Sequence, residues 1–363
     1  MIIRRAFYRE AATTTTAIVA ILIVVLVLFG MTAILGRAVR GDYAETIVLE
    51  LLGWQTLKRV DLLLPLGLYL GVLLTLSRWY RDSEMTVLAA CGISLLQLLR
   101  PVLVLAAVMA LLTAAAAFYL TPHATFEMER LKTESAHRPD IAGVNPGTFT
   151  EGAAGGRIVY AEDAAADGSL TQVFVNNPSR EHPRVILSRQ GRSQVDERGD
   201  RFVVLSDGWA YEGIPGQKDY QIVRFDRYTV RIDPKPAVAP PEKIEALPTS
   251  ALLRADRREA RAEWHWRLSK PVLVFVLAAF ALVLAYTDAR RGRLANLFAA
   301  ILIYFIYSNL LGLGQTLMKQ GKVPLGVGLW WVHGVMIVVV AYLLYRRNRN
   351  QSLLPRLLPA RTA

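Results

Sequence analysis

Long uncharged stretches alternate with charged segments along this chain. A helix needs about 20 mostly apolar residues to cross the hydrocarbon core of a bilayer. Four stretches reach that length, and the second and fourth each need flanking residues such as Val60 or Leu268. The stretches run from Thr13 to Gly36, Leu62 to Ser77, Pro101 to Pro122, Pro271 to Thr287, Leu294 to Met318, and Val323 to Tyr345. The pattern predicts an α-helical membrane protein with six transmembrane helices, three on either side of a polar insert.

The insert has the pattern of strands instead of helices. Runs that alternate apolar and polar residues, or are rich in β-branched and aromatic residues, are typical of half-buried strands. Such runs lie at residues 157–160, 172–175, 184–187, 202–205 and 220–232, with turn-forming Gly, Pro, Asn and Asp between them. We therefore predict an inserted all-β domain, an antiparallel sandwich or jelly roll.

These patterns divide the chain into four parts. We expect residues 1–122 to hold the first three helices and residues 123–245 to hold the β-jelly-roll domain with its proline-rich, extended linker at 233–241. Residues 246–350 should form a charged connecting helix, at about 250–267, and the last three helices. Residues 351–363 remain as a tail.

The charges indicate how the helices are oriented. The 363-residue chain carries a net charge of +12, but residues 123–270 hold 22 basic and 22 acidic side chains, so the excess lies beside the apolar stretches. This placement favours membrane topology over a nucleic-acid partner. With the N-terminus inside, the cytoplasmic segments hold 14 Lys and Arg and the short outer segments hold 6. We expect both termini in the cytoplasm, the insert in the periplasm, and a first helix that is too long to be a signal peptide.

Catalytic and metal-binding motifs are missing from the sequence. The five histidines are scattered without metal-ligand spacing, and no nucleophile motif occurs. No Walker A motif occurs either, because the fragment from Gly314 to Lys322 has the wrong glycine spacing. We expect a non-catalytic chain that binds no cofactor, with ATP and Mg²⁺ used by a partner. Cys91 is expected to be a small apolar residue.

The segment between the second and third helices predicts a short helix of its own at about 83–92. Ser83 is suited to the N-cap, Gly92 to the position after the end, and Glu84 to the first turn, where the helix dipole favours a carboxylate. Apolar residues recur with helical spacing at Met85, Leu88, Ala89 and Ile93. Two interpretations are open: an amphipathic connector lying on the bilayer, or a helix that inserts into a groove on a soluble partner.

The same segment resembles the coupling helix of the lipopolysaccharide export permeases, the LptF/LptG family, and is nearer in form to the LptF half. Two further stretches are similar to that family: residues 261–268 before the fourth span, and residues 288–293 after it. The opening residues 1–5 and the edge of the first span, Leu35-Gly36…Gly41-Asp42, also fit. The resemblance covers nearly the whole chain and is weakest in the insert.

This resemblance implies a transmembrane subunit of an ATP-binding cassette (ABC) exporter in the bacterial inner membrane. The implied partners are LptG, as the second half of a heterodimer, a dimer of the LptB ATPase, and then LptC and LptA, which receive lipopolysaccharide. The first and fifth spans would line the lateral gates. Glu84 would contact the ATPase, with Met85, Leu88 and Ile93 supplying apolar contacts.

The resemblance also implies sites for lipopolysaccharide. Family members often carry a basic residue in the outer part of the first span, but residues 31–35 have none here, so Arg37 and Arg40 are the candidates for lipid A phosphates. Both also fit ordinary interfacial anchors. Acyl chains outside a membrane must be shielded from water. The candidates for that role are apolar strand residues that equally suit a plain core: Val159, Phe174, Ile186 and Phe225.

Two alternatives to an exporter remain from the sequence. One is a non-transporting subunit that only transmits ATPase motion to a periplasmic domain. The other is an integral membrane enzyme acting on lipid, and the lack of clustered catalytic residues argues against it.

Overall fold

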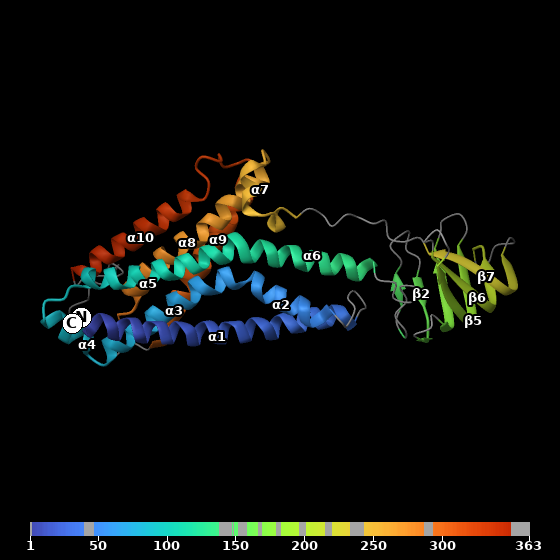
Figure 1. Ribbon diagram of the computed structural model, residues 1–363, viewed down its shortest axis with the longest axis horizontal. Helices are drawn as coiled ribbons and strands as arrows, with labels where there is room; N and C mark the ends of the chain where they lie inside the picture. The colour runs from blue at the N-terminus through green and yellow to red at the C-terminus, as the bar shows by residue number, and fades with distance from the viewer. Residues whose placement is uncertain are drawn as a thin grey trace, which may run out of the picture. The chain divides into compact units, whose positions relative to one another are not determined.

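The computed structural model describes residues 2–39, 47–137, 147, 149–151, 158–165, 169–178, 183–195, 201–214, 220–232, 243–286 and 293–349. The chain divides into two compact units, one of residues 1–33, 49–128 and 242–363 and one of residues 34–48 and 129–241. The first unit is helical and the second holds the sheet (Figure 1). The predicted helical fold with an inserted antiparallel β domain is confirmed. The proline-rich linker and the C-terminal tail lie outside the described residues.

The helical unit is built from long helices joined by short ones. The helices are α1 (Ile2–Val39), α2 (Val48–Lys58), α3 (Val60–Arg81), α4 (Glu84–Ala90), α5 (Leu95–Ala115), the π-helical turn η2 (Ala116–Leu120), α6 (Thr121–His137), the 3₁₀ turn η4 (Ile244–Ala246), α7 (Thr249–Arg254), α8 (Arg258–Leu284), α9 (Arg293–Lys319) and α10 (Trp330–Asn348). α8 is the central helix, because it contacts α3, α5, α9 and α10. Its buried residues form the core with those of α3 and α5.

Five of the described helices are long and apolar enough to cross a membrane. They are Ile3–Ala38, Val60–Arg81, Leu95–Thr133, Arg258–Leu284 and Ala295–Lys319. The predicted sixth span, Val323 to Tyr345, overlaps the 19-residue helix α10, which begins only at Trp330 and is not among these five. The polar C-terminal end of α10 explains this, because Arg346, Arg347 and Asn348 lie within the helix.

Three helix boundaries differ from the prediction because prolines lie inside helices. The third span begins at Leu95, ahead of Pro101, and the helical segment continues past Pro122 to His137. A proline removes one helical hydrogen bond and clashes with the preceding turn. The π-helical turn η2 ends two residues before Pro122. The backbone hydrogen bonds therefore already depart from the α-helical pattern where the proline lacks a donor. Likewise α8 runs straight through Pro271, and the predicted charged helix is interrupted at residues 255–257.

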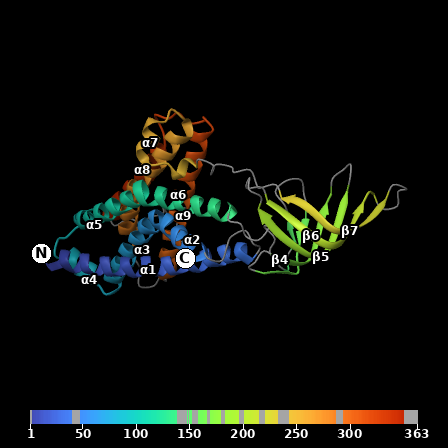
Figure 2. The same cartoon turned by 45° about the vertical axis from the view of Figure 1, so that its right-hand side comes forward.

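The second unit holds one antiparallel sheet of seven strands. They are β1 (Thr150–Glu151), β2 (Ile158–Tyr160), β3 (Asp163–Ala164), β4 (Ser169–Asn177), β5 (Arg184–Val195), β6 (Arg201–Glu212) and β7 (Gln221–Ile232), in the order β1-β2-β4-β5-β6-β7 with β3 also paired to β4. Figure 2 shows the long strands β4 to β7 as a curved sheet. The β domain is confirmed, but its described strands follow a meander without the crossover that a jelly roll contains.

Candidate functional site

The segment between α3 and α5 is fixed at both ends by backbone hydrogen bonds. Gly92 has a φ of 82°, and the N–H groups of Gly92 and Ile93 donate to the carbonyls of Ala89 and Leu88, both at 3.0 Å. This is a Schellman motif, which satisfies carbonyls that a helix end otherwise leaves unpaired. The prediction of a helix that ends at Gly92 is therefore confirmed.

The two serines of the segment play different parts from those expected. Ser83 occupies the N-cap of α4, but its backbone is left-handed, with a φ of 62°, and its side chain makes no capping bond. Ser94 caps α5 instead: its hydroxyl accepts from the Gln97 N–H, and the Gln97 side chain accepts from the Ser94 N–H. The Ser-x-x-Gln spacing is a sequence signal for this capping box, although the capping box was not predicted.

α4 turns its predicted apolar residues toward this chain's own core. Met85 is 7% exposed within the core of the helical unit, and Leu88 and Ile93 pack against that core. Val87 is 61% exposed, and Glu84 is half-exposed. Met85, Leu88 and Ile93 thus hold the helix in place rather than forming an open face, which corrects their expected orientation. The outward surface consists of Glu84, Thr86, Val87, Ala89 and Ala90, and its contact with a partner stays a prediction.

A group of charges links α4 to two other helices. The Arg78 Nη2 lies 2.6 Å from the Glu10 Oε2 and 4.0 Å from the Glu84 Oε1. The Trp79 Nε1 donates to the same Glu10 Oε2 at 2.8 Å. Asp82 completes the group, with its carboxylate 3.8 Å from the Arg78 Nε.

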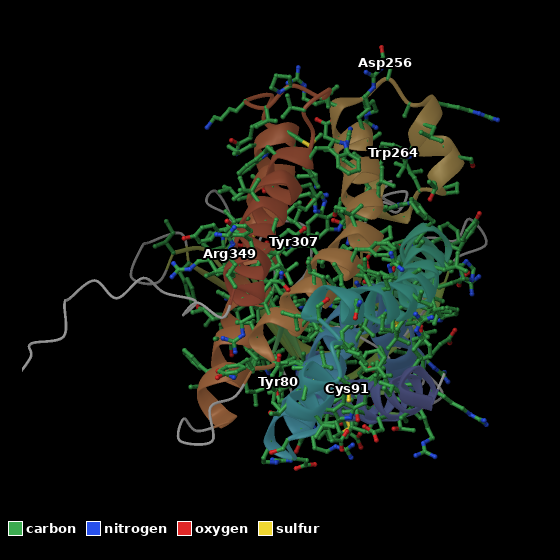
Figure 3. The ribbon with its side chains drawn as sticks, turned by 90° about the vertical axis from the view of Figure 1, so that its left-hand side faces the viewer. Tyr80, Cys91, Asp256, Trp264, Tyr307 and Arg349 are labelled. Atoms are coloured by element: carbon green, nitrogen blue, oxygen red, sulfur yellow. The ribbon has the colours of Figure 1, made fainter. Side chains whose placement is uncertain are left out.

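The chain segments at this end of the unit are the ones predicted to be cytoplasmic. Figure 3 shows Tyr80 and Cys91 at the opposite end of the helical unit from Asp256 and Trp264. The Tyr80 ring contacts Tyr286, at the end of α8, and the Arg347 guanidinium of α10 lies 3.2 Å from the centre of the Tyr286 ring. The ends of α3, α8 and α10 therefore meet at the end of the unit that carries α4.

Two buried ion pairs among the described helices were not predicted from the sequence. Arg267 pairs with Glu263 at 3.1 Å, and the Gln315 side chain donates to the other Glu263 oxygen. Lys270 lies 3.8 Å from Asp61 and 4.1 Å from the centre of the Trp266 ring. The Glu-x-x-x-Arg spacing of Glu263 and Arg267 is a helical ion-pair signal beside an apolar span, and it was readable from the sequence.

Arg267 also binds the chain that returns from the insert. Its guanidinium donates to the Thr249 hydroxyl at 2.9 Å and to the carbonyls of Glu245 and Leu247 at 3.1 and 2.9 Å. Four of the five N–H donors of the guanidinium thus have partners, from α8, α7 and the turn before it. This contact lies within residues 261–268, one of the stretches that resembles the permease family.

The four candidate acyl-chain residues do not share one face of the sheet. Ile186 and Phe225 are buried in the core of the β domain, and Val159 packs against it. Phe174 alternates with the inward Val173 and Val175, so the period of two puts it on the other face, where it contacts Phe149. Phe174 therefore cannot line the same surface as the other three, and the prediction is wrong for this residue.

That other face carries a row of apolar side chains. The register aligns Tyr160, Phe174, Leu187 and Trp209 on neighbouring strands. Leu187 and Trp209 are 42% and 45% exposed, and the Arg224 guanidinium lies over the Trp209 ring.

The candidate phosphate contacts stay predictions. Arg37 is exposed in the last turn of α1. Arg40 lies outside the described residues. Within the described part of the chain, no group of three or more His, Cys, Asp or Glu side chains is arranged to hold a metal ion.

Comparison with known proteins decides the family. The family described as "Lipopolysaccharide export system permease LptF/LptG" matches residues 5–346. The chain belongs to this family. Proteins named "Lipopolysaccharide export system permease protein LptF", from Escherichia coli K12 and Shigella flexneri, are each 30% identical over 353 residues. Each alignment covers 95% of this chain and 94% of the relative.

Membership gives the permease a coarse function. An LptF/LptG permease has a role in lipopolysaccharide export, and the apolar helices are those of a multi-pass membrane protein. The motif at residues 83–94 thus lies in a capped, partly exposed element of a transport protein. Residues 287–292, which hold most of a third family stretch, lie outside the described residues.

Proposed function

We propose that this permease is the transmembrane subunit of an ATP-driven ABC exporter in the bacterial inner membrane. It extracts lipopolysaccharide from that membrane and passes it through its periplasmic β domain toward the outer membrane. Both termini are cytoplasmic in this proposal, and the chain itself binds neither ATP nor Mg²⁺. LptG forms the other half of the heterodimer, two LptB subunits hydrolyse ATP, and LptC and LptA receive the lipid.

One observation carries the ATP-driven part of the proposal: α4 is short, capped, and exposed along one side. A coupling element must be stiff enough to transmit a force and open enough to be docked. The Schellman motif and the Ser94–Gln97 capping box give the segment defined ends. Met85 anchors it in the core, while Glu84 and Val87 remain accessible. This combination supports docking to a soluble partner over an amphipathic connector, because Met85, Leu88 and Ile93 pack against this chain's core instead of facing lipid.

The β domain supports the lipid-transfer part. A lipid moving through water needs an apolar trough, since each exposed CH₂ costs about 0.8 kcal/mol. The inward residues Val159, Ile186 and Phe225 line the core of a curved sheet whose opening would provide one.

The test is reconstitution of the purified four-subunit complex in vesicles with lipopolysaccharide. We expect ATP to release lipid to LptC and LptA, and we expect photo-crosslinkers at Val159, Ile186 and Phe225 to trap it only when ATP is present. A crosslinker at Phe174, on the opposite face, is the matched control. If ATP is hydrolysed but no lipid leaves the vesicle or crosslinks to the insert, the chain is a non-transporting subunit that only transmits motion.

A further inference from the structure

Arg78 is placed where three helices meet. It lies in the last turn of α3, and its Nη2 faces carboxylates on both sides: Glu10 of α1 at 2.6 Å and Glu84 of α4 at 4.0 Å. A single guanidinium nitrogen is therefore shared between the helix proposed to dock the ATPase and the first membrane helix. The shorter of the two contacts is the one to α1.

We propose that Arg78 is the positioning residue that transmits movement of α4 to α1. This inference rests on the proposed function, because it requires a basic group of the ATPase to approach Glu84. That group would compete with Arg78 for the Glu84 carboxylate. Arg78 would then keep Glu10 and Asp82 as its carboxylate partners, and the forces on α1 would change with the nucleotide state of the partner.

The contacts of α1 make Glu10 an effective point at which to act on it. The Glu10 carboxylate also accepts from the Trp79 indole, and Phe7 packs edge-on against the same indole at a centroid distance of 5.8 Å. One to two turns further along, Thr15 and Val19 lie directly against Gly71 and Gly67 of α3. A Cβ on Gly71 would lie 2.8 Å from the Thr15 Cα, so the two backbones are in close contact.

Beyond Val19, the apolar surface of α1 is open in this chain. Its large side chains are exposed at Ile21, Val24, Leu28 and Phe29. α1 is one continuous helix of 38 residues, so a displacement at Glu10 is carried along its axis rather than absorbed in a loop. Arg78 thus joins α4 to the part of α1 that packs against α3, and the exposed part of α1 continues from it in the same helix.

The experiment measures the position of α1 and the output of transport in the same complex. Spin labels are placed at Ala12→Cys on α1 and Val104→Cys on α5, both exposed, after Cys91→Ser removes the sole native cysteine. The partner subunits are made free of cysteine. The distance between the labels and the lipid released per ATP are recorded with and without trapped ATP. We expect trapping to change the distance in the otherwise unaltered chain.

Arg78→Gln should abolish that change and lower the lipid released per ATP by about 5-fold or more, the low end of typical coupling between sites. Arg81→Gln is the matched control. Arg81 is one turn away on α3 and pairs with Asp82 at 3.6 Å. It should leave both readouts unchanged. Arg78→Lys, which keeps the charge, should restore most of the coupling.

A charge swap separates transmission from stability. Glu10→Arg with Arg78→Glu rebuilds the pair between α1 and α3 but places a carboxylate facing Glu84. We expect this double variant to assemble normally and still lose the distance change. If Arg78→Gln keeps the distance change and releases lipid normally, the inference is overturned while the proposed function stands. If the unaltered complex releases no lipid with ATP, the proposed function itself fails.

Discussion

α1 and α8 have the same kind of sequence, a long apolar helix, but opposite surroundings. Of the most apolar 18 residues of each helix, 11% are buried in α1 and 78% in α8, although α1 has the higher mean hydropathy. In water the more apolar helix would be the more buried one. In a bilayer, lipid tails are as apolar as leucine, so a helix with high hydropathy can expose its surface to lipid or to another membrane subunit.

The charges follow the same division. α8 carries Glu263, Arg267 and Lys270 in its buried surface, each with a partner. α1 has no charged residue between Glu10 and Arg37. A buried ion pair fixes neighbouring helices in one arrangement, whereas a smooth apolar surface permits sliding. We infer that α8 is the fixed helix of the unit and that the exposed part of α1, beyond Val19, is the part able to move.

Breaking the buried ion pair of α8 should have the largest effect on stability. Arg267→Leu leaves Glu263 buried without its cation and removes the donors to Thr249 and to two carbonyls. Removing one member of a buried pair costs about 3–5 kcal/mol. We expect a large fall in the unfolding temperature of the purified chain in detergent. Arg261→Leu, on the same helix but with an exposed pair to Asp256, should change stability by about 0.5 kcal/mol or less. Equal losses of stability in the two variants would contradict the view that buried ion pairs fix α8.

Crowding the contact between α1 and α3 should have an intermediate effect. A Cβ on Gly71 would collide with the Thr15 Oγ1, so Gly71→Ala forces the two helices apart. Overpacking of this kind costs about 1–3 kcal/mol. Gly312→Ala in α9 is the control, because among the described residues nothing beyond the helix's own adjacent backbone lies within 4 Å of the added methyl. Thr15→Gly should partly restore the stability of the Gly71→Ala variant, and a failure to do so would place the strain elsewhere.

Trimming the open face of α1 should have the smallest effect on the isolated chain. Phe29 is 75% exposed, so Phe29→Ala leaves no cavity in this chain. The unfolding temperature in detergent should stay nearly constant, with a change of about 0.5 kcal/mol or less. Phe280→Ala in α8, at 1% exposed, should by contrast cost about 3–5 kcal/mol. A marked loss of stability for Phe29→Ala would show that α1 is packed more tightly than its exposure indicates.

Much of this architecture was readable from local sequence. The lengths of the uncharged stretches predicted the spans, the alternation of apolar and polar residues predicted the strands, and Gly92 predicted the end of α4. Each of these signals depends only on residues that are neighbours in the sequence. The face that α4 buries was not readable. The spacing of Met85, Leu88 and Ile93 predicts an apolar side but cannot distinguish this chain's core from a partner's groove.

Contacts between residues that are distant in the sequence could not be predicted either. Arg267 is satisfied by Thr249 and by two carbonyls, and Arg78 is shared between Glu10 and Glu84, so neither role follows from spacing. Phe174 was placed on the wrong face because the inward positions of β4 are Val173 and Val175. An error of one residue in strand register moves a side chain to the opposite face.

The most direct test of ATP-coupled export is the amount of lipopolysaccharide released per ATP by a complex carrying Glu84→Ala. An interfacial carboxylate that pairs with the ATPase should weaken its association by roughly 2–5 kcal/mol when removed. A helix-dipole role alone is worth about 0.3–1 kcal/mol. Asp82→Asn, a neighbouring half-exposed carboxylate that also pairs with Arg78, is the matched control. We predict that Glu84→Ala inserts normally but loses ATPase association or releases far less lipid per ATP, and that a compensating charge swap on the ATPase restores release. Normal assembly and a normal release rate in Glu84→Ala would contradict the account. Glu84 would then only stabilise its own helix through the helix dipole.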